Sequence, residues 1–310
     1  MQTQATSNIL MIRPVQFQFN EETAESNTFQ DPAVAELPES KTQAKALAEF
    51  DEMVDRLRLA GVNVIVFNDN STHYTPDSIF PNNWVSFHAS GKVVLYPMEA
   101  ENRRMERRKD IIDELQKTYN VEVIYDFSHF ESENEFLEGT GSLVLDRMYR
   151  KAYACISSRT SEVVLKAWKK QVQTYDVISF RAFGRDGLPI YHTNVMMCVG
   201  NTFAVVCLES VKDYDERFAL KQHLEEDGKN IIEISMEQMA SFAGNMLLVK
   251  KQNEGHLLVM SDTAYYSLTD SQLSELEEYA ELIHFDLSMI EACGGGSARC
   301  MMAEVHLPLK

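Results

Sequence analysis

Basic residues are scarce in this chain. Its 310 residues include 29 Lys and Arg against 47 Asp and Glu, which gives a formal net charge of −18. Nucleic acids and anionic membrane surfaces are bound by clustered Lys and Arg, so neither is expected as a partner. The one basic run, residues 103–109, is mixed with acidic residues on a predicted helix and indicates a solvated helix face.

Long apolar runs and paired cysteines are missing as well. No stretch approaches the roughly 18 apolar residues of a membrane span. The first residues lack the basic and then apolar pattern of a signal peptide. The five cysteines are odd in number and form no C-x-x-C pair, which favours a reduced, cytoplasmic protein over a disulfide framework. The histidines show no metal-ligand spacing, so no bound metal is expected.

The chain does contain a repeated order of predicted elements. A unit of strand, strand, helix and strand starts near residues 84, 142, 192, 245 and 299, a period of roughly 50 residues. The last strand, 299–306, completes a fifth unit if it joins strand 9–19, helix 40–61 and strand 62–67. We predict an α/β fold in which residues 1–310 form a single domain, a five-bladed propeller with pseudo-fivefold symmetry. An open mixed α/β sheet is the alternative, and a homo-oligomer is left open.

Polar residues recur where each unit begins. They are Asn82-Asn83, Glu138-Gly139, His192 with Asn194, Gly244-Asn245, and Gly294–Gly296 before Cys300. The starts of the units should meet near the ring axis. Five separate sequence positions are therefore expected to share one small cavity.

Cys300 is the candidate nucleophile in this cavity. The glycines before it let the backbone approach a ligand closely, and they are expected to keep the thiol uncovered. A thiolate is a strong nucleophile, and His192 is its candidate acid–base partner. Strand periodicity places His192 and Asn194 on one face. The alternatives are a packed Cys300 or a disulfide between Cys293 and Cys300.

Glu138 is the candidate acid. It lies between an apolar pair and two glycines, a setting that suits a partly buried carboxylate, although a simple turn residue is the alternative. The pair Gly139 and Gly141 is not a dinucleotide fingerprint, because the third glycine of that motif is missing and a strand is predicted to follow.

These motifs resemble those of the amidinotransferase and arginine deiminase superfamily, whose members modify guanidino groups on a five-bladed ββαβ propeller, the pentein fold. The resemblance lies in F-x-E-G at 136–139, H-x-N at 192–194 and the glycine run before Cys300. Three further segments look like the bacterial branch assigned to citrulline-utilising hydrolases: 11–14, 80–84 and 294–301.

The resemblance implies a role for each candidate. Cys300 would attack the central carbon of a guanidino or ureido group, His192 would carry protons to the leaving nitrogen and from water, and Glu138 would bind substrate nitrogen and orient His192. The covalent step needs no cofactor. The expected partner is a small guanidino or ureido amino acid. Arg185, in a glycine-flanked loop, is the first choice among Arg13, Arg181, Arg185 and Arg299 to hold its carboxylate.

The substrate-binding positions depart from those of the deiminases that the chain resembles. Two aspartates that usually grip the guanidinium cation correspond to Asn83 and Asn194, and Asp77 could replace one of them. Because an amide side chain can hydrogen-bond a neutral ureido group but cannot balance the charge of a cation, the sequence favours a citrulline-like substrate over arginine.

Three functions remain open at this point. A cysteine-dependent C–N hydrolase is the first. An amidinotransferase that passes the group to an amine is the second, since the sequence does not separate water from an amine as the acceptor. A non-catalytic binding protein is the third, and the presence of Cys300, His192 and Glu138 together argues against it.

Overall fold

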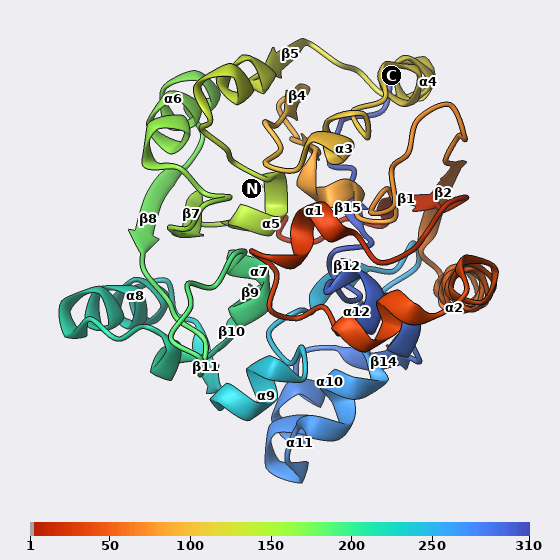
Figure 1. Ribbon diagram of the computed structural model, residues 1–310. Coiled ribbons are helices and arrows are strands. Elements are labelled where there is room, and N and C mark those ends of the chain that lie inside the picture. Colours follow the sequence, from red (N-terminus) through yellow and green to blue (C-terminus); the bar gives the residue numbers. More distant parts are fainter. Residues whose placement is uncertain (1–2) are drawn as a thin grey trace.

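A computed structural model describes residues 3–310, which form 15 strands in five three-stranded sheets. In every sheet one antiparallel pair is extended by a parallel third strand. The sheets are distributed around the middle of the molecule, and most of the longer helices lie at its periphery (Figure 1). The strands are β1 Asn8–Arg13, β2 Asn63–Asn68, β3 Val85–Phe87, β4 Lys92–Leu95, β5 Val123–Asp126, β6 Leu143–Asp146, β7 Lys151–Cys155, β8 Asp176–Phe180, β9 Met197–Val199, β10 Phe203–Val206, β11 Asn230–Glu233, β12 Leu247–Lys250, β13 His256–Ser261, β14 Glu281–Phe285 and β15 Ala303–Glu304.

Helices connect the two parallel strands of each sheet, as a parallel connection requires. Helix α6 shows how the local sequence sets a helix. The Ser161 side chain caps its start by accepting a hydrogen bond from the Val163 amide, and Leu165 and Trp168 form part of its buried face. The α-helices of residues 3–310 are α1 Glu21–Ala24, α2 Glu39–Leu59, α3 Glu101–Arg104, α4 Lys109–Thr118, α5 Gly139–Ser142, α6 Glu162–Val172, α7 Thr193–Met196, α8 Tyr214–Glu226, α9 Met236–Ala240, α10 Asp262–Ser267, α11 Asp270–Glu277 and α12 Ser288–Gly294. Short 3-10 helices cover Pro32–Glu36, Pro81–Asn83, Ser128–Glu133 and Leu208–Ser210.

The two ends of the chain share one sheet, in the order β15, β1, β2. Leu10 lies opposite Ala303 in an antiparallel pair and opposite Ile65 in a parallel one. The predicted joining of the last strand to the N-terminal strands is therefore confirmed. The predicted strand 9–19 was too long, because β1 ends at Arg13, directly before Pro14.

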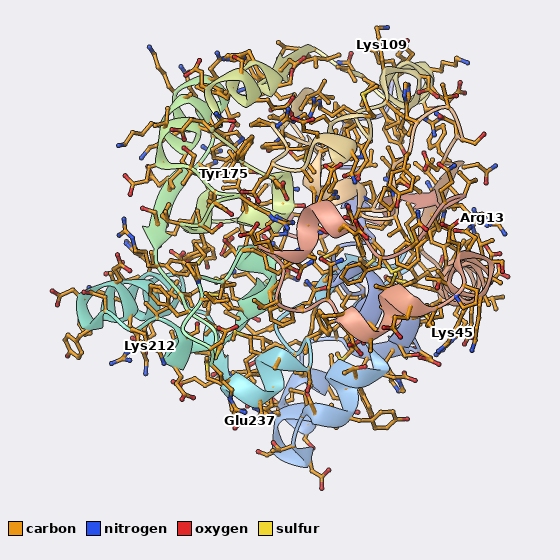
Figure 2. The ribbon with its side chains drawn as sticks, viewed as in Figure 1. Arg13, Lys45, Lys109, Tyr175, Lys212 and Glu237 are labelled. Carbon is orange, nitrogen blue, oxygen red and sulfur yellow. The ribbon has the colours of Figure 1, made fainter. Side chains whose placement is uncertain are left out.

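The basic run is not the single solvated helix face that the sequence predicted. The chain forms two helices there, and the break between α3 and α4 turns the ends of the run in different directions. Lys109 points outward (Figure 2), whereas Arg103 is only 2% exposed. The sequence predicted one helix across residues 102–118, because its helical periodicity did not reveal the break between α3 and α4.

The H-x-N segment also differs from its prediction. His192 has extended backbone angles but stands at the N-cap of α7, and Asn194 lies within that helical turn, so β9 begins only at Met197. The two residues are thus not alternate positions of one strand. No helix of residues 3–310 has the length and apolar character that crossing a membrane requires.

Candidate active site

The sequence positions at which the predicted units begin meet around one buried cavity. The space open to the centre of a water molecule is about 10 Å³, roughly that of one water. The lining residues come from segments far apart in the chain: Asn27, Asp77, Phe80, Asn83, Arg103, Arg159, Tyr191, His192, Gly294, Gly296 and Cys300. Of the predicted site residues, Glu138 and Asn194 lie directly behind this lining, bonded to His192 and Cys300.

Cys300 is held by the loop that follows α12. Its amide donates to the Ser297 carbonyl at 2.9 Å, and the Ser297 hydroxyl donates to buried Glu291 at 2.6 Å. A Cβ atom added at Gly294 would come within 2.7 Å of the Phe80 ring, so that glycine permits close packing. The prediction of an uncovered thiol was wrong, since Cys300 is only 3% exposed. Its thiol and that of Cys293 are both free, which excludes the disulfide alternative.

His192 and Glu138 form a buried pair. His192 Nε2 lies 2.8 Å from Glu138 Oε2, and the other carboxylate oxygen accepts the Glu99 amide at 3.0 Å. Burial lowers the pKa of His192 to about 4, against the hydrogen bond and charge of Glu138. Burial opposes the ionisation of Glu138, but the charge of Arg159 and the hydrogen bond from His192 hold its pKa well below the usual range.

This pairing fixes the tautomer of the imidazole. An ionised Glu138 can only accept, so Nε2 carries the proton and Nδ1 is left as an acceptor at neutral pH. A Cβ atom at Gly141 would lie 2.7 Å from Nδ1, and only glycine fits there. His192 can therefore take up a proton at Nδ1 and release it again.

Two arginines that sequence reasoning missed, Arg103 and Arg159, also line the cavity. Arg103 is held by Glu106 through two bonds of 2.9 and 3.0 Å and donates to Asn83 Oδ1 at 3.1 Å. Arg159 lies 3.5 Å from Glu138 and 4.9 Å from the centre of the Tyr191 ring. The end of α3 at Arg104, which separates Arg103 from the predicted surface helix, left no signal in the sequence pattern.

Asp77 brings an acid into the cavity. It is 2% exposed, its Oδ2 accepts from Asn20 at 2.7 Å, and its Oδ1 has no hydrogen-bond partner. Burial raises the pKa of Asp77, although Arg103 at 3.8 Å opposes the rise. Asn83 Nδ2 and Asn194 Oδ1 are likewise buried without a partner. Such atoms are costly to bury and are suited to bind a polar ligand.

Arg185 does not belong to this site. Its side chain is largely exposed and pairs with Glu237, which lies at the rim of the molecule (Figure 2). The loop that carries it turns outward instead of toward Cys300. The other candidates for the substrate carboxylate do not line the cavity either: Arg13 pairs with Asp51, Arg181 with Glu162 and Glu216, and Arg299 with Glu304.

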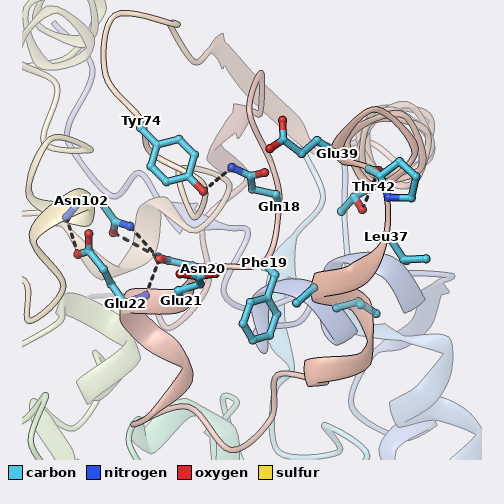
Figure 3. Close-up of a pocket in the computed structure, with 13 residues that line it drawn as sticks. Gln18, Phe19, Asn20, Glu21, Glu22, Leu37, Glu39, Thr42, Tyr74 and Asn102 are labelled. Carbon is cyan, nitrogen blue, oxygen red and sulfur yellow. Dashed lines mark hydrogen bonds between the residues drawn. The ribbon is translucent and has the colours of Figure 1, made fainter.

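The segment 20–31 covers the cavity, with α1 across the middle of the molecule (Figure 1). Asn27 donates to the Gly294 carbonyl at 3.1 Å, and Gln30 donates to that of Cys293 at 3.0 Å. A larger cavity of about 570 Å³ lies on the outer side of this segment, between it and the start of α2 (Figure 3). It holds none of Cys300, His192 and Glu138; Asn20 lines it and also bonds Asp77.

Buried histidines should make stability depend on pH. The His306 side chain is 4% exposed, and burial lowers its pKa to about 4. Between about pH 6.5 and pH 4 the unfolded chain therefore binds a proton that the folded chain does not, so this contribution is lost as the pH falls, by up to about 3 kcal/mol. When the free energy of unfolding is measured in urea at pH 7, 6 and 5, it is expected to fall less with decreasing pH for His306→Gln than for the wild type. Parallel curves for the two proteins would contradict the assignment.

A buried thiol, an imidazole–carboxylate pair and a buried acid with one unbonded oxygen define a site suited to attack at the carbon of a guanidino group. A family model described as eukaryotic N,N dimethylarginine dimethylhydrolase matches residues 13–307. The chain belongs to this family, and thereby to the amidinotransferase and arginine deiminase superfamily that the motifs predicted. The description of this family makes the chain a hydrolase of the class that cleaves C–N bonds in arginine derivatives. Assignment to the citrulline-utilising branch stays a prediction.

Solved structures share the fold at low identity. The N-terminal domain of ArgZ, covalently bound to a reaction intermediate, is 17% identical with a TM-score of 0.76, over 97% of this chain and 98% of that one. ArgZ is an arginine dihydrolase of the ornithine–ammonia cycle in cyanobacteria. The chain matches 41% of full-length ArgZ. A dimethylarginine dimethylaminohydrolase with an S-methyl-L-thiocitrulline adduct is 16% identical with a TM-score of 0.66, over 98% and 100% of the two chains. No curated protein sequence matches this chain significantly.

Proposed function

We propose that the protein hydrolyses the guanidino group of an arginine-like amino acid through a covalent intermediate on Cys300. The observation that carries this proposal is the meeting of Cys300, the His192–Glu138 pair and the unpartnered Oδ1 of Asp77 at one buried cavity. A guanidinium cation would supply the donors that Asp77 lacks, and its charge would offset that of the buried acid.

The first half of the reaction forms the covalent intermediate. The sulfur of Cys300 bonds to the guanidino carbon while the thiol proton passes to Nδ1 of His192. The proton then moves to a departing nitrogen, the C–N bond breaks, and ammonia or an amine leaves. The remaining group is a thiouronium cation on Cys300, and Glu138 balances the transient charge on His192.

The second half uses water. A water molecule attacks the thiouronium carbon and gives one proton to His192, and the C–S bond then breaks. The thiol is restored, the product carries a ureido group, and one proton is released to solvent. The cavity has room for about one water, so we infer that segment 20–31, which contributes Asn27 to the lining, must move for substrate to enter and ammonia to leave.

A neutral, citrulline-like ureido substrate is the second candidate. Asn83 and Asn194 each keep a free amide atom beside the cavity, and the charges of Arg103 and Arg159 already oppose those of the buried acids. A product assay for ammonia, citrulline and ornithine, with arginine, methylated arginine, citrulline and agmatine as substrates, separates the two. We expect nitrogen release from a guanidino compound. Release from citrulline alone would favour the second candidate, and release from none would overturn the proposal.

Asp77→Asn should weaken the use of a cationic substrate. The amide keeps the size of the side chain and removes the charge that faces the guanidinium, a loss of about 1.5–3 kcal/mol for a hydrogen bond to a charged group. We expect kcat/KM for the best guanidino substrate to fall by about 10- to 100-fold. Glu39→Gln, which removes a charge from the outer cavity instead, is the matched control. Equal values for both variants would show that Asp77 does not bind the cation.

We also infer that the five sheets form a closed ring and that the chain is a single domain. Each unit contacts the next. Strands make three of these contacts, β15 with β3, β6 with β9 and β9 with β12, and a helix and a strand make the other two, α5 with β3 and α2 with β14. Closure would leave no sheet without a neighbour and would hold the five unit starts at one axis. A homo-oligomer stays a proposal that sedimentation of the purified protein can test.

A further inference from the structure

Asn245 lies beside the reacting sulfur, in the fourth of the unit starts that the sequence brings to the centre. Its side chain is fully buried, and its Nδ2 donates to Cys300 Sγ at 3.3 Å. No step of the proposed reaction has yet used it. Its contacts show how the sulfur is held before substrate arrives.

The orientation of the Asn245 amide is dictated by the backbone around it. On one side the Arg299 amide donates to Oδ1 at 3.1 Å, and a backbone amide can bond only to an oxygen. On the other side Nδ2 donates to the carbonyl of Asn194 at 3.0 Å. The second hydrogen of this NH₂ group therefore points to the sulfur. A flipped amide would place its NH₂ group against the Arg299 amide, which is also a donor, and its oxygen against the Asn194 carbonyl, which is also an acceptor.

A second amide makes the same contact. Asn194 Nδ2 donates to Cys300 Sγ at 3.3 Å, while its Oδ1 keeps no partner. Within residues 3–310 the resting thiol donates one long hydrogen bond, of 3.7 Å, to Asn245 Oδ1, which already accepts from Arg299, so its proton is weakly held before His192 takes it in the reaction. The sulfur thus faces two N–H donors and a poor acceptor, so negative charge that develops on it during the reaction finds donors already in place.

The backbones that carry these two amides pack directly against each other. A Cβ atom at Gly244 would lie 2.3 Å from the Val195 carbonyl oxygen, so the backbone before Asn245 rests directly on the turn that carries Asn194. Both donors therefore extend from backbone segments that are in direct contact, which fixes the spacing of the positions that carry them.

We propose that Asn245, with Asn194, stabilises the negative charge of the Cys300 sulfur and aims it at the substrate carbon. The proposal deepens the proposed function and rests on Cys300 being its nucleophile. Asn194 then binds both the sulfur and the substrate, since its NH₂ group donates to Cys300 and its oxygen can accept an N–H of the substrate. Loss of the Asn245 donor makes the thiolate less favourable without removing the nucleophile.

The test is a titration of the Cys300 thiolate by its ultraviolet absorbance, with Cys300→Ala as the blank. Asn245→Asp keeps the acceptor for Arg299 and removes the donor, and Asn245→Ala is the second variant in case the first fails to fold. We expect the midpoint of thiolate formation to rise by about one pH unit or more in either variant. The acid limb of kcat/KM against pH should move by the same amount.

Ser297→Ala is the matched control, because it removes one buried hydrogen bond from the same loop without touching the sulfur. It should lower the melting temperature and leave the thiolate midpoint unchanged. Midpoints of the Asn245 variants that equal the wild type would overturn the inference. The titration requires no turnover, so it still gives an answer if the proposed substrate proves wrong, and the two failures stay distinguishable.

Discussion

Cys300→Ala is expected to reduce turnover of the best guanidino substrate by on the order of 10³-fold or more while the protein stays folded. The thiol is the nucleophile at the cavity, and alanine leaves nothing that can form the covalent intermediate. The change leaves the buried amides of Asn194 and Asn245 without their sulfur acceptor, so the melting temperature should fall, but the core packing is kept and the protein should stay folded. Steady-state kinetics and a thermal melt of the same preparation measure both quantities.

Cys293→Ala is the matched control for this experiment. Cys293 is fully buried, and burial raises the pKa of its thiol to about 12, so it stays protonated and unreactive. Its replacement should cost stability but keep most of the activity. If Cys293→Ala is the inactive variant and Cys300→Ala turns over normally, the nucleophile has been assigned to the wrong thiol.

His192→Ala should be nearly as damaging as Cys300→Ala. The imidazole accepts the thiol proton and returns it to the leaving nitrogen, so neither half of the reaction proceeds at a normal rate without it. Because the two residues act as one unit, the double variant should be little slower than either single variant. The comparison of all three kcat/KM values measures this coupling.

His88→Ala separates this effect from a loss of folding. His88 is also buried, but it bonds Ser86 and lies outside the cavity of Cys300. It should lower the melting temperature and retain activity wherever the variant is folded. Multiplicative losses in the double variant of Cys300 and His192 would instead assign His192 a structural role.

Much of the candidate site could be predicted from element order. Glu138, His192 and Cys300 each lie at or next to the start of a repeated unit, and equivalent points of equivalent units meet around one centre. That argument needs no side-chain detail, and Asn83 and Asn194 follow from it too. Asp77 lies before a unit start, and its free oxygen at the cavity was visible only in the structure.

What the sequence missed are positions where tertiary packing overrides a local pattern. Arg103 looks like a surface cation in a basic helix, yet the helix breaks after it and Glu106 turns with it into the interior. Arg185 lies in a loop that suits recognition, but nothing in its own sequence says to which side the loop turns. His192 was assigned to a strand because a single helical turn between two strand segments leaves no periodicity to detect.

The central claim is that a covalent intermediate forms on Cys300, and mass spectrometry of acid-quenched reactions tests it most directly. Wild-type protein mixed with an arginine-type substrate and quenched during turnover should carry an added mass, equal to the substrate minus the ammonia or amine that leaves, on the peptide that contains Cys300. Cys300→Ala should carry none. Rapid substrate turnover with no adduct on Cys300 at any quench time, or an adduct confined to Cys293, would contradict the account.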